Sequence, residues 1–322
     1  MKRTVVRWLG AAVLLLACGA ALAQAYPSRP IHFIIPFAAG GGSDVMARII
    51  AEPLSQRMGV PIIVENKPGA NAVTGADYVA KSAPDGYTML HTSPGPQITN
   101  PFLMPKLPYD PVKDLQPVAR LGVFVNVLVV HPSVPAKNLK EFVALGKSKP
   151  GTLNFASLGQ ATTQGLAGTL FNMMTGIDAV QIPYKGSAPG TTDLLAGNVQ
   201  YMFNALPSEL AHIQSGRLRA LGVSSLKRSP SLPDVPPIND TVKGYDVTTW
   251  YSLVAPAGTP PEIVDKLNKE IAAIIESPAV REKIREQGVE ADAMTPAQLG
   301  AHLHKERDRW AKVIRDAKIQ QE

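Results

Sequence analysis

Three consecutive glycines followed by a Ser–Asp pair, Gly40–Asp44, are the residues of this 322-residue chain best suited to bind a small anion. Glycine has no Cβ and tolerates positive φ, so a ligand can press against the backbone of such a loop. The pair opens a helix-like segment, Asp44–Met58, whose first N–H groups lack partners within the helix and attract anions. We therefore predict an anion-binding loop. The alternative is a tight turn after a strand, with Ser43 only a helix N-cap.

A second segment has the same order of strand, small residues and helix start. Its strand-like run ends at Ser157, Leu158 and Gly159 follow, and a helix-like run begins at Thr162. Neither 37–44 nor 157–163 contains Lys or Arg, so backbone N–H groups and hydroxyls would hold an anion between them. Each charge-assisted hydrogen bond contributes about 1.5–3 kcal/mol, and each helix N-terminus about 0.3–1 kcal/mol. Such loops favour a small carboxylate over a highly charged phosphate ester.

The motifs of several enzyme classes are missing from the sequence. It has no G-x-S-x-G elbow and no H-E-x-x-H zinc motif, and Gly146–Ser148 lacks the first glycine of a phosphate loop because Glu141 stands there. Val45 occupies the place of the third glycine of a dinucleotide fingerprint. The six histidines show no metal-ligand spacing. We therefore expect a binding protein without catalytic residues, metal or cofactor.

The elements that position these loops alternate between strand and helix, which predicts an α/β fold with a parallel sheet. Two long strand-like runs, Leu121–Val130 and Thr248–Ala255, flank the second half of this alternation. The chain would enter a second domain through one run and return through the other. This predicts domain 1 at 26–125 plus 248–322, domain 2 at 126–247, and a ligand cleft between them. Shorter strands are expected at Ile31–Ile35, Ile62–Glu65, Tyr87–Thr92, Thr152–Ser157, Ala179–Pro183, Val199–Asn204 and Arg219–Ser224.

The C-terminal part of the chain is predicted to be helical. Thr259–Glu262 has the pattern of a capping box with proline at the first helical position, and Thr295-Pro296 opens the last helix in the same way. The last helix is expected to pack on the first domain. The apolar stripe of the helix that follows Thr259 comprises Ile263, Leu267, Ile271 and Ile274.

The N-terminal 25 residues have the pattern of a cleaved export signal. Positive residues within Lys2–Arg7 precede an apolar run that ends in a small-residue cleavage motif at Ala21–Ala23. The run is too short to span a bilayer stably. The one cysteine, Cys18, lies in this run in a context that loosely resembles a lipoprotein signal, but the bulky Leu16 and the motif at 21–23 favour ordinary cleavage. The mature protein would then have no disulfide and would depend on its buried core.

The charge of the mature chain is modest. Removing 1–23 takes away three positive charges and no negative ones, so the formal net charge falls from +6 to +3. No cluster of Lys and Arg with interleaved aromatic residues is present, so nucleic-acid binding is not expected.

From Tyr26 onward the sequence resembles the Bug-type receptors, which are the periplasmic solute-binding proteins of the tripartite tricarboxylate transporter family. The resemblance covers nearly the whole mature chain and rests on the segments 26–44, 64–70, 84–88, 154–157, 183–186 and 218–221. It implies a two-lobed type II periplasmic-binding-protein fold that closes over one organic acid as a monomer. It also implies a location in the periplasm and a membrane transporter as partner.

The resemblance also implies ligand-binding residues, since the two loops grip a carboxylate in this family, partly through ordered waters. Asp44 would either cap the helix or position a water or a ligand ammonium group. The other residues are Phe37 as a wall, Gly41, Gly42 and Ser43 as donors, Ser157, Thr162 and Thr163 in the second loop, and Ser93 and Asn204 at the far end of the ligand.

Two positions depart from the family pattern. Gln164-Gly165 stands where many relatives have Ser-His, and Asn204 stands where an acidic residue is frequent. Asn204 cannot pair with a ligand ammonium group as an acidic side chain would. A plain carboxylate or aromatic acid is therefore favoured over an amino acid. We expect a receptor that captures a small carboxylate for transport. The alternatives are a sensor that presents the ligand to a membrane signalling protein, and an exported hydrolase.

Overall fold

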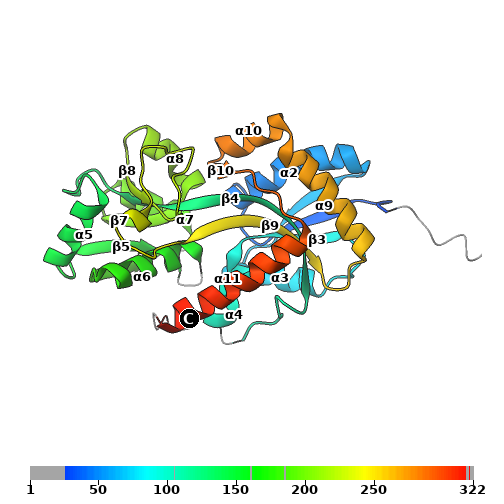
Figure 1. The fold of residues 1–322 in the computed structure, drawn as a ribbon, viewed down its shortest axis with the longest axis horizontal. Coiled ribbons are helices and arrows are strands. Elements are labelled where there is room, and N and C mark those ends of the chain that lie inside the picture. The colour runs from blue at the N-terminus through cyan, green and yellow to red at the C-terminus, as the bar shows by residue number, and fades with distance from the viewer. Residues whose placement is uncertain (1–25, 105, 160–161, 185, 317–318, 320–322) are drawn as a thin grey trace, which may run out of the picture.

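The computed structural model describes residues 26–104, 106–159, 162–184, 186–316 and 319, which form two α/β lobes lying side by side (Figure 1). The predicted export signal at 1–25, with Cys18, lies outside the described residues.

The strands are β1 (Ile31–Ile35), β2 (Ile62–Asn66), β3 (Thr88–Thr92), β4 (Leu115–Val130), β5 (Leu153–Ser157), β6 (Ala179–Pro183), β7 (Tyr201–Ala205), β8 (Arg219–Val223), β9 (Thr248–Pro256) and β10 (Val289–Glu290). The α-helices are α2 (Gly42–Met58), α3 (Val73–Ala80), α4 (Asn100–Leu103), α5 (Leu139–Ser148), α6 (Thr163–Thr175), α7 (Ser187–Leu195), α8 (Leu206–Gln214), α9 (Pro261–Glu276), α10 (Pro278–Glu286) and α11 (Pro296–Asp316). Three short helical turns are η1 (Ala70–Ala72), η2 (Gly95–Thr99) and η3 (Ile238–Asp240). None of the described helices combines the length and the apolar character that a membrane crossing requires.

Each lobe is organised around three parallel strands. In lobe 1, β1 lies between β2 and β3, and α2, α3, α9 and α10 surround them. In lobe 2, β5 lies between β6 and β7, with α5 to α8 around them. The carboxyl ends of parallel neighbours share one edge of a sheet, so each lobe presents its strand-end loops along one edge. The predicted α/β fold class with two lobes is confirmed.

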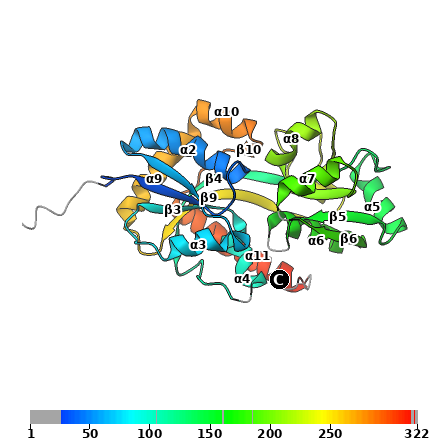
Figure 2. The ribbon, with the colours of Figure 1, turned by 180° about the vertical axis from the view of Figure 1, so that it is seen from behind.

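The strands β4 and β9 lie at the centre of one continuous sheet, and β4 continues into lobe 2. β4 pairs with β9 as far as Val125, which lies opposite Thr248, and from Asn126 onward it pairs with β7 and β8 of lobe 2. The change of partner makes these strands the connection between the lobes (Figure 2). β4 begins at Leu115, earlier than predicted, because Pro117 and its polar neighbours interrupt the apolar pattern and the register with β9 shifts there.

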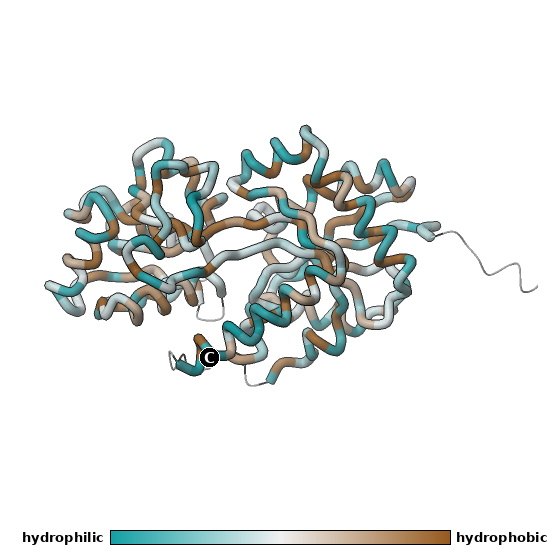
Figure 3. Tube along the Cα trace, in the orientation of Figure 1, coloured by the Kyte–Doolittle hydropathy of each residue, from teal (hydrophilic) through white to brown (hydrophobic). Residues whose placement is uncertain are grey.

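Helices α2 and α9 bury one face of the sheet in lobe 1. The predicted stripe on α9 is confirmed, since Leu267, Ile271 and Ile274 are buried in one cluster with Ile50 and Leu54 of α2. Fully burying a Leu or Ile side chain contributes about 1.5–3 kcal/mol, so this contact is a main source of stability in lobe 1. Figure 3 shows hydrophobic residues along β4 at the centre, while the surrounding helices alternate between hydrophobic and hydrophilic residues.

One of the two predicted capping boxes is present. At the start of α11, the Thr295 N–H donates to Gln298 Oε1 at 2.9 Å, and the Gln298 N–H donates to Thr295 Oγ1 at 3.3 Å. At the start of α9 the prediction was wrong, because Pro260 is the N-cap and the Thr259 hydroxyl donates to the carbonyl of Pro256 at 2.8 Å. The two prolines hold the backbone extended before the helix and move the threonine away from the capping position.

The last helix, α11, extends beyond the lobe on which it was predicted to pack. Its Trp310 belongs to the same buried cluster as Tyr245 of lobe 2. Arg309 Nη1 donates to the carbonyl of Asp246 at 2.8 Å, just before β9 begins. Trp250 of β9 also faces α11, with its ring 4.5 Å from that of His302. α11 therefore joins lobe 1 to lobe 2 along one face of the connecting strands.

Candidate functional site

The strand-end edges of the two lobes meet at Gly42, the first residue of α2. A Cβ placed on Gly42 would lie 3.9 Å from Pro207 Cβ, in the first turn of α8, and 2.8 Å from the hydroxyl oxygen of Tyr251 in β9. The glycine loop of lobe 1 thus faces the connection between β7 and α8 of lobe 2. Gly288, just after α10, also lies against Leu206, so the lobes adjoin along this side.

Asp44 holds the glycine loop in shape. Its Oδ2 accepts the Gly40 N–H at 3.0 Å and Arg48 Nε at 3.1 Å, and its Oδ1 accepts Arg48 Nη2 at 3.1 Å and Asn66 Nδ2 at 3.0 Å. Asn66 Nδ2 also donates to the carbonyl of Phe37, whose side chain is half-buried. Burial opposes ionisation of Asp44, but the bonds from Arg48, Gly40 and Asn66 outweigh it and lower the pKa of Asp44. Both carboxylate oxygens are used within the loop.

Ser43 does not cap the helix, so that prediction was wrong. α2 begins at Gly42 with the exposed, extended Gly41 as its N-cap, and no side chain caps it. Ser43 is the second helical residue and points down toward the sheet, where its Oγ lies 3.0 Å from Nδ1 of His91 in β3. The Ser43 hydroxyl pairs with His91, and not with an N–H group of the helix, because both groups are buried and neither reaches water there.

His91 is a site residue that sequence reasoning missed. Burial lowers its pKa to about 4, so the ring is uncharged at neutral pH. Its Nε2 has no partner among the described residues, and a proton there would be an unsatisfied buried donor. With the ring proton on Nδ1, the ring donates to Ser43 Oγ and the Ser43 proton is available to a ligand, whereas with the proton on Nε2 the Ser43 hydroxyl donates to Nδ1. The alternation of β3 places His91 on the inner face with Met89, which is the signal that could have revealed it.

Tyr251 is a second residue that the sequence did not reveal. Its ring stacks on Phe124 of β4 at 4.5 Å and lies 5.4 Å from the ring of His91. Its hydroxyl lies directly under Gly42, and no hydrogen bond joins it to another described residue. A side chain at position 42 would collide with this hydroxyl, so the third glycine of the loop is required by packing.

The second loop is organised by Thr162, the N-cap of α6. The Thr162 hydroxyl accepts the Gly165 N–H at 3.0 Å and donates to the carbonyl of Gly159 at 2.8 Å. A Cβ on Gly165 would lie 1.9 Å from that carbonyl oxygen, which explains why glycine stands here in place of a larger residue. Thr163 donates its hydroxyl to Gln164 Oε1 at 3.1 Å. Residues 160 and 161 lie outside the described residues.

The starts of α2 and α6 converge over β9. Asn126 Nδ2 donates to the Thr163 carbonyl at 3.5 Å and to Thr249 Oγ1 at 3.4 Å, which places α6 over Thr249. The start of α2 lies over Tyr251, two residues further along the strand. Side chains two apart in a strand share a face and are about 7 Å apart. The two predicted loops are therefore brought to the same side of the connecting strands.

The remaining predicted residues lie deeper or nearer the rim. Ser157 is buried and its Oγ accepts from Gln181 Nε2 at 2.7 Å. Asn204 is fully buried, and its Oδ1 accepts the Ser187 hydroxyl at 3.0 Å. Ser93 follows β3 and is half-buried. The structure therefore places Gly42 beside Pro207 at the start of α8, while Ser157 and Asn204 are buried and bonded to Gln181 and Ser187.

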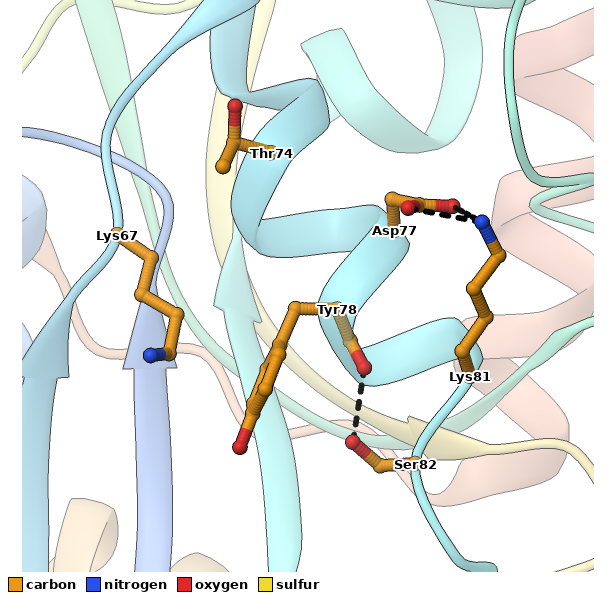
Figure 4. Close-up of a pocket in the computed structure, with 6 residues that line it drawn as sticks. All are labelled: Lys67, Thr74, Asp77, Tyr78, Lys81 and Ser82. Atoms are coloured by element: carbon orange, nitrogen blue, oxygen red, sulfur yellow. Dashed lines mark hydrogen bonds and ion pairs between the residues drawn. The ribbon is translucent and has the colours of Figure 1, made fainter.

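A separate hollow lies on lobe 1 beside α3 (Figure 4). Its two lysines are already engaged, since Lys67 Nζ lies 4.4 Å over the ring of Tyr78 and Lys81 pairs with Asp77 at 2.7 Å. It lies on lobe 1 alone, away from the starts of α2 and α6. We therefore place the functional site between the lobes, where the chemistry converges, and not in this hollow.

Two lobes joined by crossing strands, with helix starts converging over those strands, define a solute-binding receptor of the periplasmic-binding-protein class. Residues 46–319 match the model of the tripartite tricarboxylate transporter family receptor. The chain belongs to this family. Its members are solute-binding receptors of the periplasm and not enzymes, so the predicted class of protein is confirmed.

Relatives found by sequence and relatives of known structure both match nearly the whole chain. The chain is 40% identical over 298 residues to protein BugT of Bordetella pertussis, covering 91% of each chain. It is 34% identical to Rpa4515 of R. palustris, solved with adipate, with a TM-score of 0.87 over 92% of this chain and 100% of that one. It is 31% identical to MatC of Rhodopseudomonas palustris, solved with malate, with a TM-score of 0.82 over 90% and 100%.

Proposed function

We propose that this receptor captures a small organic carboxylate between its lobes, closes over it and delivers it to a membrane transporter of the tripartite tricarboxylate type. The observation that carries the proposal is the convergence of the starts of α2 and α6 over one face of β9. Relatives crystallised with adipate and malate support the ligand class.

The carboxylate would be held by the N–H groups of Gly41, Gly42 and Ser43, by the Ser43 hydroxyl and by the start of α6 at Thr162 and Thr163. Phe37 and Tyr251 would wall this end of the cleft, the tyrosine contributing its hydroxyl. Ser157 would support the second loop from below, and Ser93 and Asn204 belong to the far end. Asp44 would act through the loop, because both its oxygens are used there.

Closure would be a rotation of the two lobes about β4 and β9. The change of pairing partner between Val125 and Asn126 supports domain limits of 26–125 plus 248–322 and of 126–247. The closed form would gain affinity because only there do both loops touch the ligand. We also propose export by cleavage of 1–25, location in the periplasm, and action as a monomer.

The test is calorimetric titration of the purified mature chain with adipate and with malate, alongside small-angle scattering. We expect saturable binding of a carboxylate and a more compact scattering profile at saturation. Ser43→Ala and Thr163→Ala should each weaken binding by roughly 2- to 10-fold, as expected for one lost hydrogen bond. Identical scattering with and without bound ligand, or affinities unchanged in both variants, would contradict this account.

A further inference from the structure

Glu209 is a buried carboxyl group without a cation. It lies in the first turn of α8 and is fully buried. Its Oε1 accepts Thr191 Oγ1 and Asn204 Nδ2, each at 2.6 Å, whereas its Oε2 has no partner among the described residues. No Lys or Arg of the described part of the chain forms an ion pair with it. Burying such a group is costly, so structure alone does not account for a glutamate here.

The carboxyl group fixes the orientation of Asn204. Since Glu209 Oε1 receives the amide N–H of Asn204, the amide oxygen must face the other way. There it accepts the Ala205 N–H at 2.9 Å and the Ser187 hydroxyl at 3.0 Å. The Ser187 proton is thereby used, and the lone pairs of its oxygen remain for another donor. The chain Glu209–Asn204–Ser187 therefore ends in a hydrogen-bond acceptor.

This acceptor lies on the edge of lobe 2 that faces the glycine loop. Asn204 is next to the last residue of β7, and Ser187 is the half-buried first residue of α7, which follows β6. β5, β6 and β7 are parallel neighbours, so both residues lie at one edge, beside Pro207 and hence near Gly42.

We infer that Glu209 is a specificity-determining residue that makes the lobe 2 end of the cleft select a hydrogen-bond donor on the ligand, a hydroxyl or ammonium group, over a second carboxylate. Glu209 acts as a positioning residue through Asn204 and Ser187. This inference rests on the proposed function, in which the opposite end of the ligand is a carboxylate.

The test compares three probes with the same six-carbon chain: adipate, 6-hydroxyhexanoate and 6-aminohexanoate. Their affinities are measured by calorimetry at pH 7.5. The wild-type receptor should bind 6-hydroxyhexanoate and 6-aminohexanoate roughly tenfold or more tightly than adipate, since a second carboxylate would face both an acceptor and a buried carboxyl group. Glu209→Gln keeps the size, but its amide can present either Oε1 or Nε2 to Asn204, so it no longer fixes the orientation of that amide and should shift the ratio toward adipate by roughly tenfold.

Two further variants guard against a folding artefact. Ser187→Ala changes a half-buried residue, and should weaken binding of 6-hydroxyhexanoate while sparing adipate. Glu262→Gln, in the exposed first turn of α9, is the matched control and should leave the ratio unchanged. An unchanged ratio in both Glu209→Gln and Ser187→Ala, or a wild-type preference for adipate, overturns the inference alone. If adipate, malate and both single-carboxylate probes all fail to bind, the proposed function fails with it.

Discussion

The two ends of the cleft are built alike and carry opposite chemistry. At the lobe 1 end, Ser43 bonds to the buried His91, and at the lobe 2 end, Ser187 bonds to Asn204 and through it to Glu209. Burial favours the uncharged form of both inner groups, since it lowers the pKa of His91 to about 4 and raises the pKa of Glu209. An imidazole N–H at Nδ1 would leave Ser43 a donor, whereas Asn204, oriented by Glu209, leaves Ser187 an acceptor. One buried residue thus decides the polarity of each end.

The two loops also differ in how firmly they are held. In the lobe 1 loop, Asp44 accepts the Gly40 N–H and the Asn66 amide that also holds the Phe37 carbonyl, whereas in the described part of the lobe 2 loop Thr162 bonds to Gly159 and Gly165. We expect the lobe 1 loop to be formed before the ligand arrives. The following five changes test this difference and the difference between the two ends.

Asp44→Ala should have the largest effect. It leaves the Gly40 N–H and the Asn66 amide without their acceptor, so unfolding should become easier by on the order of 3 kcal/mol, and adipate binding should be lost. Chemical denaturation and calorimetry measure the two effects. Asp316→Ala at the exposed end of α11 is the control. A stability loss no greater than that control shows would mean that the loop does not depend on Asp44.

The second largest effect should be a loss of stability on acidification, caused by protonation of His91. Because its pKa falls from 6.5 in the unfolded chain to about 4 in the native protein, the unfolded state binds a proton first as the pH drops. This group should therefore remove about 3 kcal/mol of stability between pH 6.5 and pH 4. Denaturation at several pH values measures it, and His91→Asn, which can still donate to Ser43, should lack this component.

Glu209 should make the free energy of unfolding depend on pH in the opposite direction. With its pKa above 4.5, the native state holds the proton more tightly, so its contribution to stability falls as the pH rises above 4.5. Glu209→Gln should therefore gain stability relative to the wild type as the pH increases. Equal slopes for His91→Asn, Glu209→Gln and the wild type would remove the contrast between the ends.

Gly42→Ala should cost about 1–3 kcal/mol of stability, because its Cβ would lie 2.8 Å from the Tyr251 hydroxyl. The double variant Gly42→Ala/Tyr251→Phe removes that oxygen and should recover most of the loss in denaturation experiments. Gly165→Ala is the contrasting variant. Its Cβ would meet the backbone carbonyl of Gly159, which no second side-chain substitution can remove. Failure of Tyr251→Phe to restore the alanine variant would show that the hydroxyl is not the obstacle.

Thr162→Ala should have the smallest effect, about 1 kcal/mol, as for an ordinary N-cap. Thr162→Ser keeps the hydroxyl and should restore both stability and adipate affinity. A loss as large as that of Asp44→Ala would erase the distinction between a firmly held and a loosely held loop.

The sequence predicts the elements well because their signals are local. The β-branched run at Ile31–Ile35 and the stripe on α9 are recovered because burial follows the period of strand and helix. The first part of β4 was missed because Pro117 breaks that period. The predicted cap at Thr259 is absent because Pro260 and Pro261 move the threonine out of the capping position. The same kind of motif does form a capping box at Thr295.

The chemistry of the site was harder to predict because its partners are distant in the chain. Ser43 meets His91 48 residues later, and Gly42 meets Tyr251 only through the pairing of β3 with β9. Glu209 is close to Asn204 in the sequence, but their side chains meet only because the chain reverses between β7 and α8. Such contacts depend on strand order, which hydrophobic periodicity does not specify.

The attachment of α11 limits how the two lobes can move. Trp250 faces α11 and its neighbour Tyr251 faces the glycine loop, so the helix and the ligand site lie on opposite sides of β9. With Arg309 bonded to the Asp246 carbonyl, the helix side is fastened to both lobes. The proposed rotation about β4 and β9 should therefore open the cleft on the ligand side, while the contacts of α11 with both lobes stay in place.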